Sequence, residues 1–295
     1  MTYEFLELTN QVQTAHWAWT IGFFLWFVGM AGMGLFINVW VRSRTLFYIA
    51  SGAAWIGTLL VLSHLSRILN LPIAGWTALT KWSFNFTSWM FIGICILAVL
   101  CVWTLLQVYM LWRKERGISR CPFTESNASY WINAVLGVAA TAYSGFLLTQ
   151  AVGIPLWNTG IVPVLWIFSG LGCALGLVEV LESMGKLEGK HLGWLSTTSH
   201  CTHIGEAFVI FAFVSVAWTG TPGAMSGAKS LVMGENAVMF WFGAIGLGLV
   251  LPTLFAMMKK NKTVMLVGGL CAILGALFLR ASVLFAGYYD PTFLG

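Results

Sequence analysis

The sequence predicts an all-α integral membrane protein that crosses the bilayer about eight times. Hydrophobic residues make up 59% of the chain and charged residues only 8%, against roughly 25% charged residues in a soluble domain. The mean hydropathy is +0.84. Lipid offers the backbone no hydrogen bonds, and the long apolar runs lack the alternation of membrane strands. The spanning segments are therefore expected to be helices.

Eight apolar stretches are each long enough to cross the hydrocarbon core, which needs about 20 residues. Little chain remains outside them, so we expect one polytopic membrane domain over residues 1–295. The acids Glu4 and Glu7 stand where a secretory signal would carry Lys or Arg, which argues against a cleaved signal peptide. The expected spans are 17–40, 45–64, 86–112, 130–152, 162–183, 203–220, 237–258 and 263–287.

Positive charge gathers in the odd-numbered connections between these spans. Eleven of the fifteen Lys and Arg residues lie there, while Arg67, Lys81 and Lys229 lie in the even-numbered ones and Arg280 lies inside the last span. Basic residues beside a span favour the cytoplasmic side, so both termini are predicted to face outward. Scattering among tight loops disfavours a nucleic-acid-binding surface. The eleven are Arg42, Arg44, Arg113, Lys114, Arg116, Arg120, Lys186, Lys190, Lys259, Lys260 and Lys262.

The six cysteines show no pair or cluster with the spacing of metal ligands. Four of them lie well inside apolar spans, where cysteine usually behaves as a small hydrophobic residue. We therefore expect no iron–sulfur cluster, no other bound metal and no disulfide framework in this chain. The cysteines are Cys95, Cys101, Cys121, Cys173, Cys201 and Cys271.

Polar residues near the predicted outer face form the first group of site candidates, because polar groups in hydrocarbon are costly and mark function by default. His64 and Arg67 are three residues apart and share a face if the helix continues past the membrane edge. The structural alternatives are interfacial histidines, an arginine that snorkels or binds a carbonyl, and a tyrosine that packs between helices. The group comprises His16, His64, Arg67, Tyr143, Gln150 and Arg280.

A second group of titratable residues lies toward the predicted inner face. Its members have i, i+3 spacing on two consecutive spans, and histidines with buried carboxylates could carry protons from the cytoplasm into the membrane. The alternative is an interfacial ion network with Lys186 and Lys190. Interpretation as a zinc site is weak, because the spacing is not that of H-E-x-x-H. The group comprises Glu179, Glu182, His200, His203 and Glu206.

Two motifs around the fourth span carry a family resemblance. Residues 143–148 read Tyr-Ser-Gly-Phe-Leu-Leu, and residues 155–158 read Pro-Leu-Trp-Asn. Together they resemble the Y-[ST]-G-x-L-L … P-x-W-[NS] signature of the NrfD/PsrC family, the membrane subunits of polysulfide-reductase-type respiratory complexes. Residues 63–67 and 279–287 resemble two further family elements. The chain departs from the family at Ser66-Arg67, where members commonly have glycine and proline, and its own proline is delayed to Pro72.

The resemblance implies two four-helix bundles, 1–152 and 153–295, with a menaquinone or ubiquinone site near the outer face of the first. It also implies an iron–sulfur partner subunit, a molybdopterin catalytic subunit beyond it, and the cytoplasmic (inner) membrane of a bacterium or archaeon. The anchor subunit of dimethyl-sulfoxide reductase is similar more distantly.

The function expected from both arguments is a quinone-reactive subunit that carries the quinone half-reaction of a multi-subunit oxidoreductase. Quinol oxidation releases protons, so the site needs a proton acceptor and hydrogen-bonding groups. In this hypothesis His64 accepts the proton, Tyr143 and His16 bind the ring oxygens with Gln150 beside them, and Arg67 and Arg280 stabilise a reduced or anionic quinone. Proton translocation through the inner group is a weaker hypothesis.

Two other functions remain open. A di-haem cytochrome b anchor needs paired axial histidines on neighbouring helices; His16 and His64 could supply an outer pair, but His200 and His203 share one helix. A secondary transporter would favour broken helices and charges at the midplane, which are scarce here.

Overall fold

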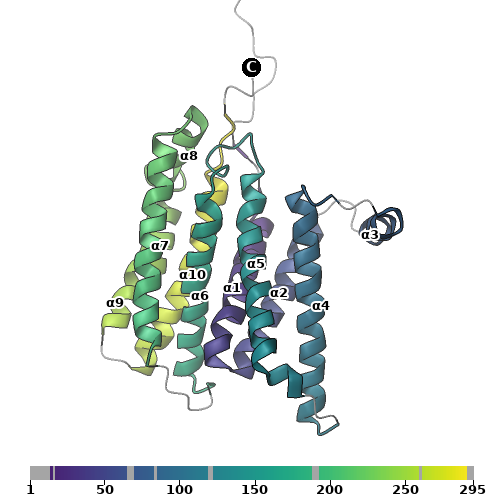
Figure 1. Ribbon diagram of the computed structural model, residues 1–295. Helices are drawn as coiled ribbons and strands as arrows, with labels where there is room; N and C mark the ends of the chain where they lie inside the picture. The colour runs from purple at the N-terminus through teal and green to yellow at the C-terminus, as the bar shows by residue number, and fades with distance from the viewer. Residues whose placement is uncertain are drawn as a thin grey trace, which may run out of the picture.

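The computed structural model describes residues 14–15, 17–64, 70–82, 85–118, 122–187, 193–258 and 261–290 (Figure 1). Within these residues, eight helices are long and apolar enough to cross a membrane, which confirms the predicted all-α fold. They are α1 (Trp19–Val41), α2 (Arg44–His64), α4 (Trp89–Glu115), α5 (Asn127–Thr149), α6 (Ile161–Ser183), α7 (Leu195–Trp218), the continuous helix Met239–Met257 and α10 (Lys262–Phe285).

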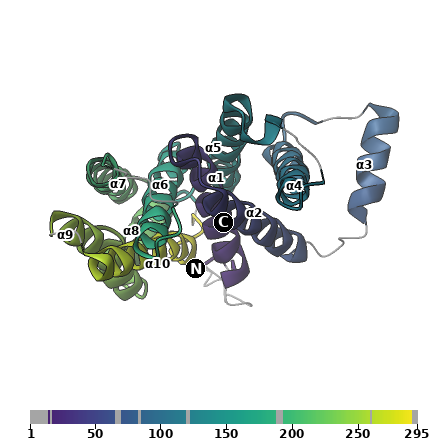
Figure 2. The same ribbon diagram turned by 90° about the horizontal axis from the view of Figure 1, so that it is seen from below.

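The shorter elements lie at the helix ends. Helix α3 (Asn70–Lys81) lies across the direction of the spans and to one side of them (Figures 1 and 2). A 3-10 turn, η1 (Pro122–Glu125), precedes α5, and α8 (Pro222–Val232) follows α7. The seventh span consists of a π-helix, η2 (Met239–Val250), continued by α9 (Leu251–Met257).

Both ends of the described chain lie at the same end of the helix bundle, which we call the termini end. Thr14 and Tyr288 form an antiparallel bridge, and the Ala15 amide donates to the Gly287 carbonyl at 3.0 Å. The opposite end, which carries Arg42, Arg44, Arg113 and Lys114, is called the basic end. An even number of spans places the termini together as the sequence predicts, and which end faces outward stays a prediction.

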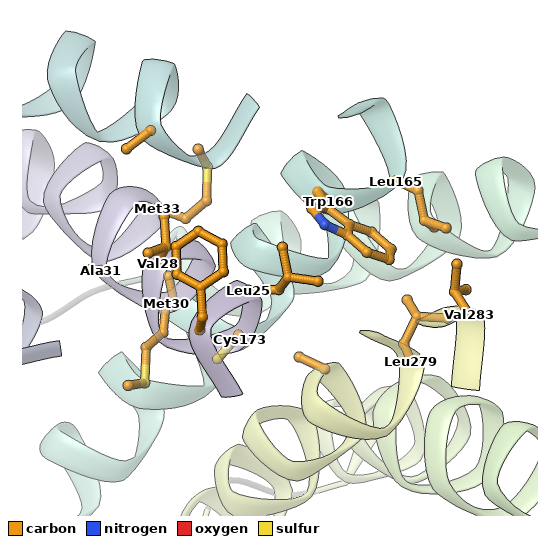
Figure 3. Packing of buried hydrophobic residues seen from close by; sticks show 14 of the residues in the cluster. Leu25, Val28, Met30, Ala31, Met33, Leu165, Trp166, Cys173, Leu279 and Val283 are labelled. Carbon is orange, nitrogen blue, oxygen red and sulfur yellow. The ribbon is translucent and has the colours of Figure 1, made fainter. Parts of the chain in front are cut away.

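Helices α1 and α6 form the centre of the bundle. In each, 72% of the most apolar stretch is buried, against 22% in α4. Helix α1 contacts α2, α5, α6 and α10, so the two halves of the chain meet along it. Figure 3 shows side chains of this core, among them Leu25, Trp166 and Leu279. The division into bundles 1–152 and 153–295 stays a prediction.

Small residues set the distance between the central helices. Gly32 of α1 and Gly137 of α5 face each other so closely that a Cβ atom on either would overlap the backbone of the other. In lipid, helices associate mainly by van der Waals packing, and glycines let two backbones approach. The α1–α5 pairing therefore depends on these two positions having no side chain.

Ion pairs hold the helix ends together at the basic end. The Arg44 guanidinium lies 2.5 Å from Glu125 Oε1, and Lys114 pairs with the other carboxylate oxygen. The Lys114 hydrogen bond lowers the pKa of the Glu125 carboxyl below its ordinary value, with Arg44 acting in the same direction. Tyr48 also donates to Glu115 at 3.1 Å. This cluster joins the start of α2, the end of α4 and η1.

Candidate functional site

Arg280 is a fully buried arginine in the termini-side half of the bundle, where α1, α6 and α10 meet. Its Nη1 donates to Ser169 Oγ at 2.8 Å and to the Ala276 carbonyl at 3.0 Å, and Nη2 donates to the Trp166 carbonyl at 3.2 Å. Nε has no partner within the described chain. All three acceptors are neutral, and Gly29 leaves the space that the guanidinium fills. The binding to carbonyls matches the structural alternative drawn from the sequence.

The signature residues occupy tight positions between helices. The Tyr143 ring is buried and lies directly over Gly93 of α4, where a Cβ atom would overlap it. Gly145 faces Pro163 of α6 at a similarly close approach. Trp157 is fully buried and its indole donates to the Val283 carbonyl at 2.9 Å, which fixes the connection before α6 to α10. These motif residues thus have packing roles that the sequence could not specify.

The predicted outer group is spread over several interfaces in the described structure. His64 ends α2 with an exposed side chain, and Gln150 follows α5, also exposed. Tyr143 lies between α4 and α5, whereas Arg280 is enclosed between α1, α6 and α10. His16 and Arg67 lie outside the described residues, so the helical face predicted for His64 and Arg67 stays a prediction. All four described residues are nevertheless on the termini side.

The predicted inner group is brought together more closely. His203 and Glu206 of α7 are both buried and face Gly172 of α6. His203 Nδ1 lies 3.8 Å from Glu206 Oε2, beyond hydrogen-bond distance, and has no other partner among the described residues. A buried imidazole whose Nδ1 lacks a hydrogen-bond partner in the described chain, beside a carboxyl group, is an unusual arrangement inside a membrane.

The other members of this group continue from the pair toward the basic end. Glu179 lies two helical turns beyond Gly172 on the same face of α6, and Glu182 lies one turn further. Glu179 lines a cavity of about 20 Å³ between α6, α7, α9 and α10, which is large enough for one water molecule. His200 lies one turn below His203 on α7 and is half-buried. We call these five residues, which lie on α6 and α7 between the basic end and the middle of the spans, the α6–α7 track.

One buried polar network was missed by the sequence interpretation. Asn133 of α5 and Gln107 of α4 exchange two hydrogen bonds of 3.0 and 3.1 Å, and the Trp103 indole donates to Asn133 Oδ1 at 2.8 Å. The signal was present, because both amides lie within apolar spans that are consecutive in the sequence. No group of three or more His, Cys, Asp or Glu side chains in the described part of the chain could hold a metal ion.

Comparison with known proteins agrees with this architecture. The sequence is 25% identical to a polysulfide reductase subunit of Wolinella succinogenes, over 97% of this protein and 98% of that one. It is 26% identical to protein NrfD of Escherichia coli, over 92% and 94%. A selenate reductase subunit of Mesobacillus selenatarsenatis is 25% identical over 59% of this protein and 43% of that one. A family model described as polysulphide reductase, NrfD matches residues 7–291, and the chain therefore belongs to this family of membrane proteins.

Proposed function

We propose that this chain is the quinone-reactive membrane subunit of a respiratory reductase complex. It passes electrons between menaquinone or ubiquinone and an iron–sulfur subunit, which connects it to a catalytic subunit that carries molybdopterin. Two relatives are named as subunits of polysulfide reductase and of selenate reductase, which supports a role within such a complex. The chain itself lies almost entirely in the membrane, so it offers the quinone step and leaves the terminal chemistry to its partners.

The observation that carries the proposal is the set of titratable side chains at membrane depth on both sides of the bundle. On the termini side are the buried Tyr143 and Arg280, with His64 at the end of α2. On the other side are His203 and Glu206. Ionisable groups in hydrocarbon are retained where protons or charges are handled. Oxidation of a quinol releases protons and electrons, so it involves both proton transfer and charge movement.

In this proposal, His64 accepts a proton from quinol at the membrane edge and passes it to water, since its side chain is exposed. Tyr143 binds a ring oxygen through its hydroxyl, and His16, Gln150 and Arg67 keep the roles proposed for them from the sequence. Arg280 acts through its field, because its guanidinium is enclosed and bonded to neutral acceptors. With the termini outside, this proton leaves on the outer side of the cytoplasmic membrane.

The test is quinol-dependent electron transfer by the assembled complex. His64→Ala is expected to lower the rate by about a hundredfold, the usual effect of losing a general base, with subunit assembly unchanged. Ser63→Ala is the matched control, because Ser63 is also exposed at the end of α2 and its hydroxyl donates to the Leu60 carbonyl of the same helix. Equal rates for His64→Ala and Ser63→Ala would remove His64 from the mechanism. Identification of the co-purified subunits tests the proposed partners.

We also propose that the α6–α7 track carries protons. Glu179, Glu182 and His200 would receive them near the basic end, and His203 and Glu206 would hold them at mid-membrane. The water-sized cavity beside Glu179 supports this role, because a single water can connect groups that are not in direct contact. If the termini end faces outward, the track would be a route by which protons enter from the cytoplasm.

A further inference from the structure

An apolar groove runs between α7 and the seventh span, on the opposite half of the molecule from Tyr143. Its volume is about 630 Å³, within the range of about 300–1,000 Å³ that small-molecule sites occupy. Its walls are hydrocarbon, formed by Ile204, Ile210 and Phe211 of α7 and by Phe240, Ile245 and Leu249 of η2. The groove is open on one side, where the surrounding medium in a membrane is lipid.

The π-helix η2 packs mainly against α10 and only slightly against α7. Gly275 of α10 faces Gly248 of η2 so closely that a Cβ atom at Gly275 would overlap the Gly248 backbone, and Gly243 accommodates the Phe278 ring. These contacts bind η2 to α10. Segments of π-helix are rare and often occur at functional sites, because they redirect side chains on one face. Here the departure from α-geometry lies along one wall of the groove.

His203 lies at the end of this groove and is its one titratable lining residue in the described chain. It is 3% exposed, and its Nδ1 has no hydrogen-bond partner among the described residues. The Trp241 indole, also in the lining, already donates to the Val232 carbonyl at 3.0 Å. The groove therefore combines a long apolar wall with the His203 imidazole at one end, whose Nδ1 is itself enclosed against Gly172 of α6.

We propose that this groove is a second binding site for a lipid-soluble quinone, with a ring oxygen at His203 and the isoprenoid tail along α7. An imidazole can donate to a quinone carbonyl or accept from a quinol hydroxyl. From His203 to Val214 the groove follows α7 for about 16 Å, which suits a tail of several isoprene units. The choice of a quinone rests on the proposed function, whereas the site itself is distinct from the one around Tyr143 and His64.

The position of His203 argues against the two common charged lipids. Helix α7 has 24 residues and is about 36 Å long, so His203, eight residues past Leu195, lies roughly 9 Å inside a hydrocarbon core of about 30 Å. A phosphate headgroup would have to leave the interface to reach it. A fatty-acid carboxylate would approach Glu206, whose Oε2 is 3.8 Å from the His203 ring. A neutral ring meets neither obstacle.

The test is photolabelling of the purified full chain in phosphatidylcholine nanodiscs with a photoreactive azidoquinone that carries a decyl tail. Labelled peptides are expected from α7 and from η2–α9, and excess decylubiquinone should abolish that label. Ala207→Trp, which fills the open wall of the groove, is expected to lower this labelling by about tenfold. Phe208→Trp is the matched control, because Phe208 is 71% exposed on the same helix and is outside the lining.

His203→Leu tests the polar end separately. Loss of one buried hydrogen bond to the ring should weaken competition by decylubiquinone about tenfold, with labelling at saturation retained. Unchanged competition would overturn the assignment of His203. Label on α7 that decylubiquinone does not displace, or no label there, would overturn the groove as a quinone site. Label that decylubiquinone displaces from α2, α4 or α5 but not from α7 would also overturn the groove as a quinone site, and it would leave the proposed function intact. Absence of displaceable label from α2, α4 and α5 would count against the proposed function.

Discussion

Two buried polar pairs lie between neighbouring helices, one in each half of the molecule, and they differ in how completely they are satisfied. Asn133 and Gln107 exchange two hydrogen bonds between α5 and α4, and a tryptophan indole adds a third. His203 and Glu206 share no hydrogen bond at 3.8 Å, and His203 Nδ1 has none within the described chain. The amides cannot titrate near neutral pH, whereas the imidazole and carboxyl groups can change charge.

Hydrogen-bond satisfaction distinguishes structural polar residues from functional ones more clearly than burial does, because both pairs are buried. A neutral network in which each amide nitrogen and oxygen is hydrogen-bonded holds two helices in one arrangement and has no group that changes charge. An ionisable pair that leaves His203 Nδ1 without a hydrogen bond in the described chain is costly to keep in a membrane and can still bind a proton. Arg280 is an intermediate case, because it makes three hydrogen bonds to neutral acceptors yet leaves Nε without a partner among the described residues.

The largest effect is expected from Glu206→Gln, which keeps the shape of the side chain but removes its titration. Proton movement coupled to turnover in proteoliposomes should fall by at least about tenfold, because the track would lose its mid-membrane carboxyl group. Quinol-dependent electron transfer measured with an uncoupler should be nearly unchanged. Glu235→Gln is the matched control, since Glu235 is an exposed glutamate beyond the track at the termini end.

Normal proton movement in Glu206→Gln would show that the two pairs do not differ in function. His203 and Glu206 would then be a structural pair like the amides, and the proposed proton path would have to be abandoned. A loss in Glu235→Gln of the same size would point to a general effect of charge, unrelated to the track.

The sequence predicts the spans well because hydropathy acts over a whole segment, but it misplaces one boundary that matters. The sixth span is expected at 203–220, whereas α7 begins at Leu195. The polar run from Ser196 to His200 lowers the local hydropathy, although hydroxyl side chains are compatible with a helix whose backbone bonds are already made. The extra turns put His203 and Glu206 deep in the membrane rather than at its edge.

Contacts between spans could not be predicted in the same way. Hydropathy reports that a helix is in lipid, and only the close packing of small residues decides which faces meet, as at Gly32 and Gly137. Depth in the membrane groups the outer candidates in the sequence, whereas the described structure places Tyr143 and Arg280 in different interfaces between helices. One wall of the groove at His203 is a π-helix, which hydrophobic periodicity does not predict.

An effect of intermediate size is expected from breaking the amide pair. Gln107→Leu leaves the Asn133 amide with an unmet donor in the protein interior and should lower the free energy of unfolding by roughly 1–3 kcal/mol. Gln107→Leu combined with Asn133→Leu should recover part of this loss, because neither amide is then left unpaired. Unfolding in mixed micelles measures both variants. A double variant that is less stable than the sum of the two single variants would contradict a satisfied structural pair.

The smallest effect is expected at the basic end, where an ion pair near the membrane surface offers a third kind of polar contact. The pKa of Glu125 is lowered in the folded protein by Lys114 and Arg44. Its contribution to stability is therefore complete above the ordinary carboxyl pKa and is lost as the pH falls through the lowered value.

Glu125→Gln should lower the free energy of unfolding by no more than about 1 kcal/mol at pH 7, since such pairs are partly exposed and screened. The difference from the wild type should vanish in acid below the carboxyl range, as measured by unfolding midpoints over a pH series. A difference that persists there would mean that Glu125 acts by packing and not by its charge.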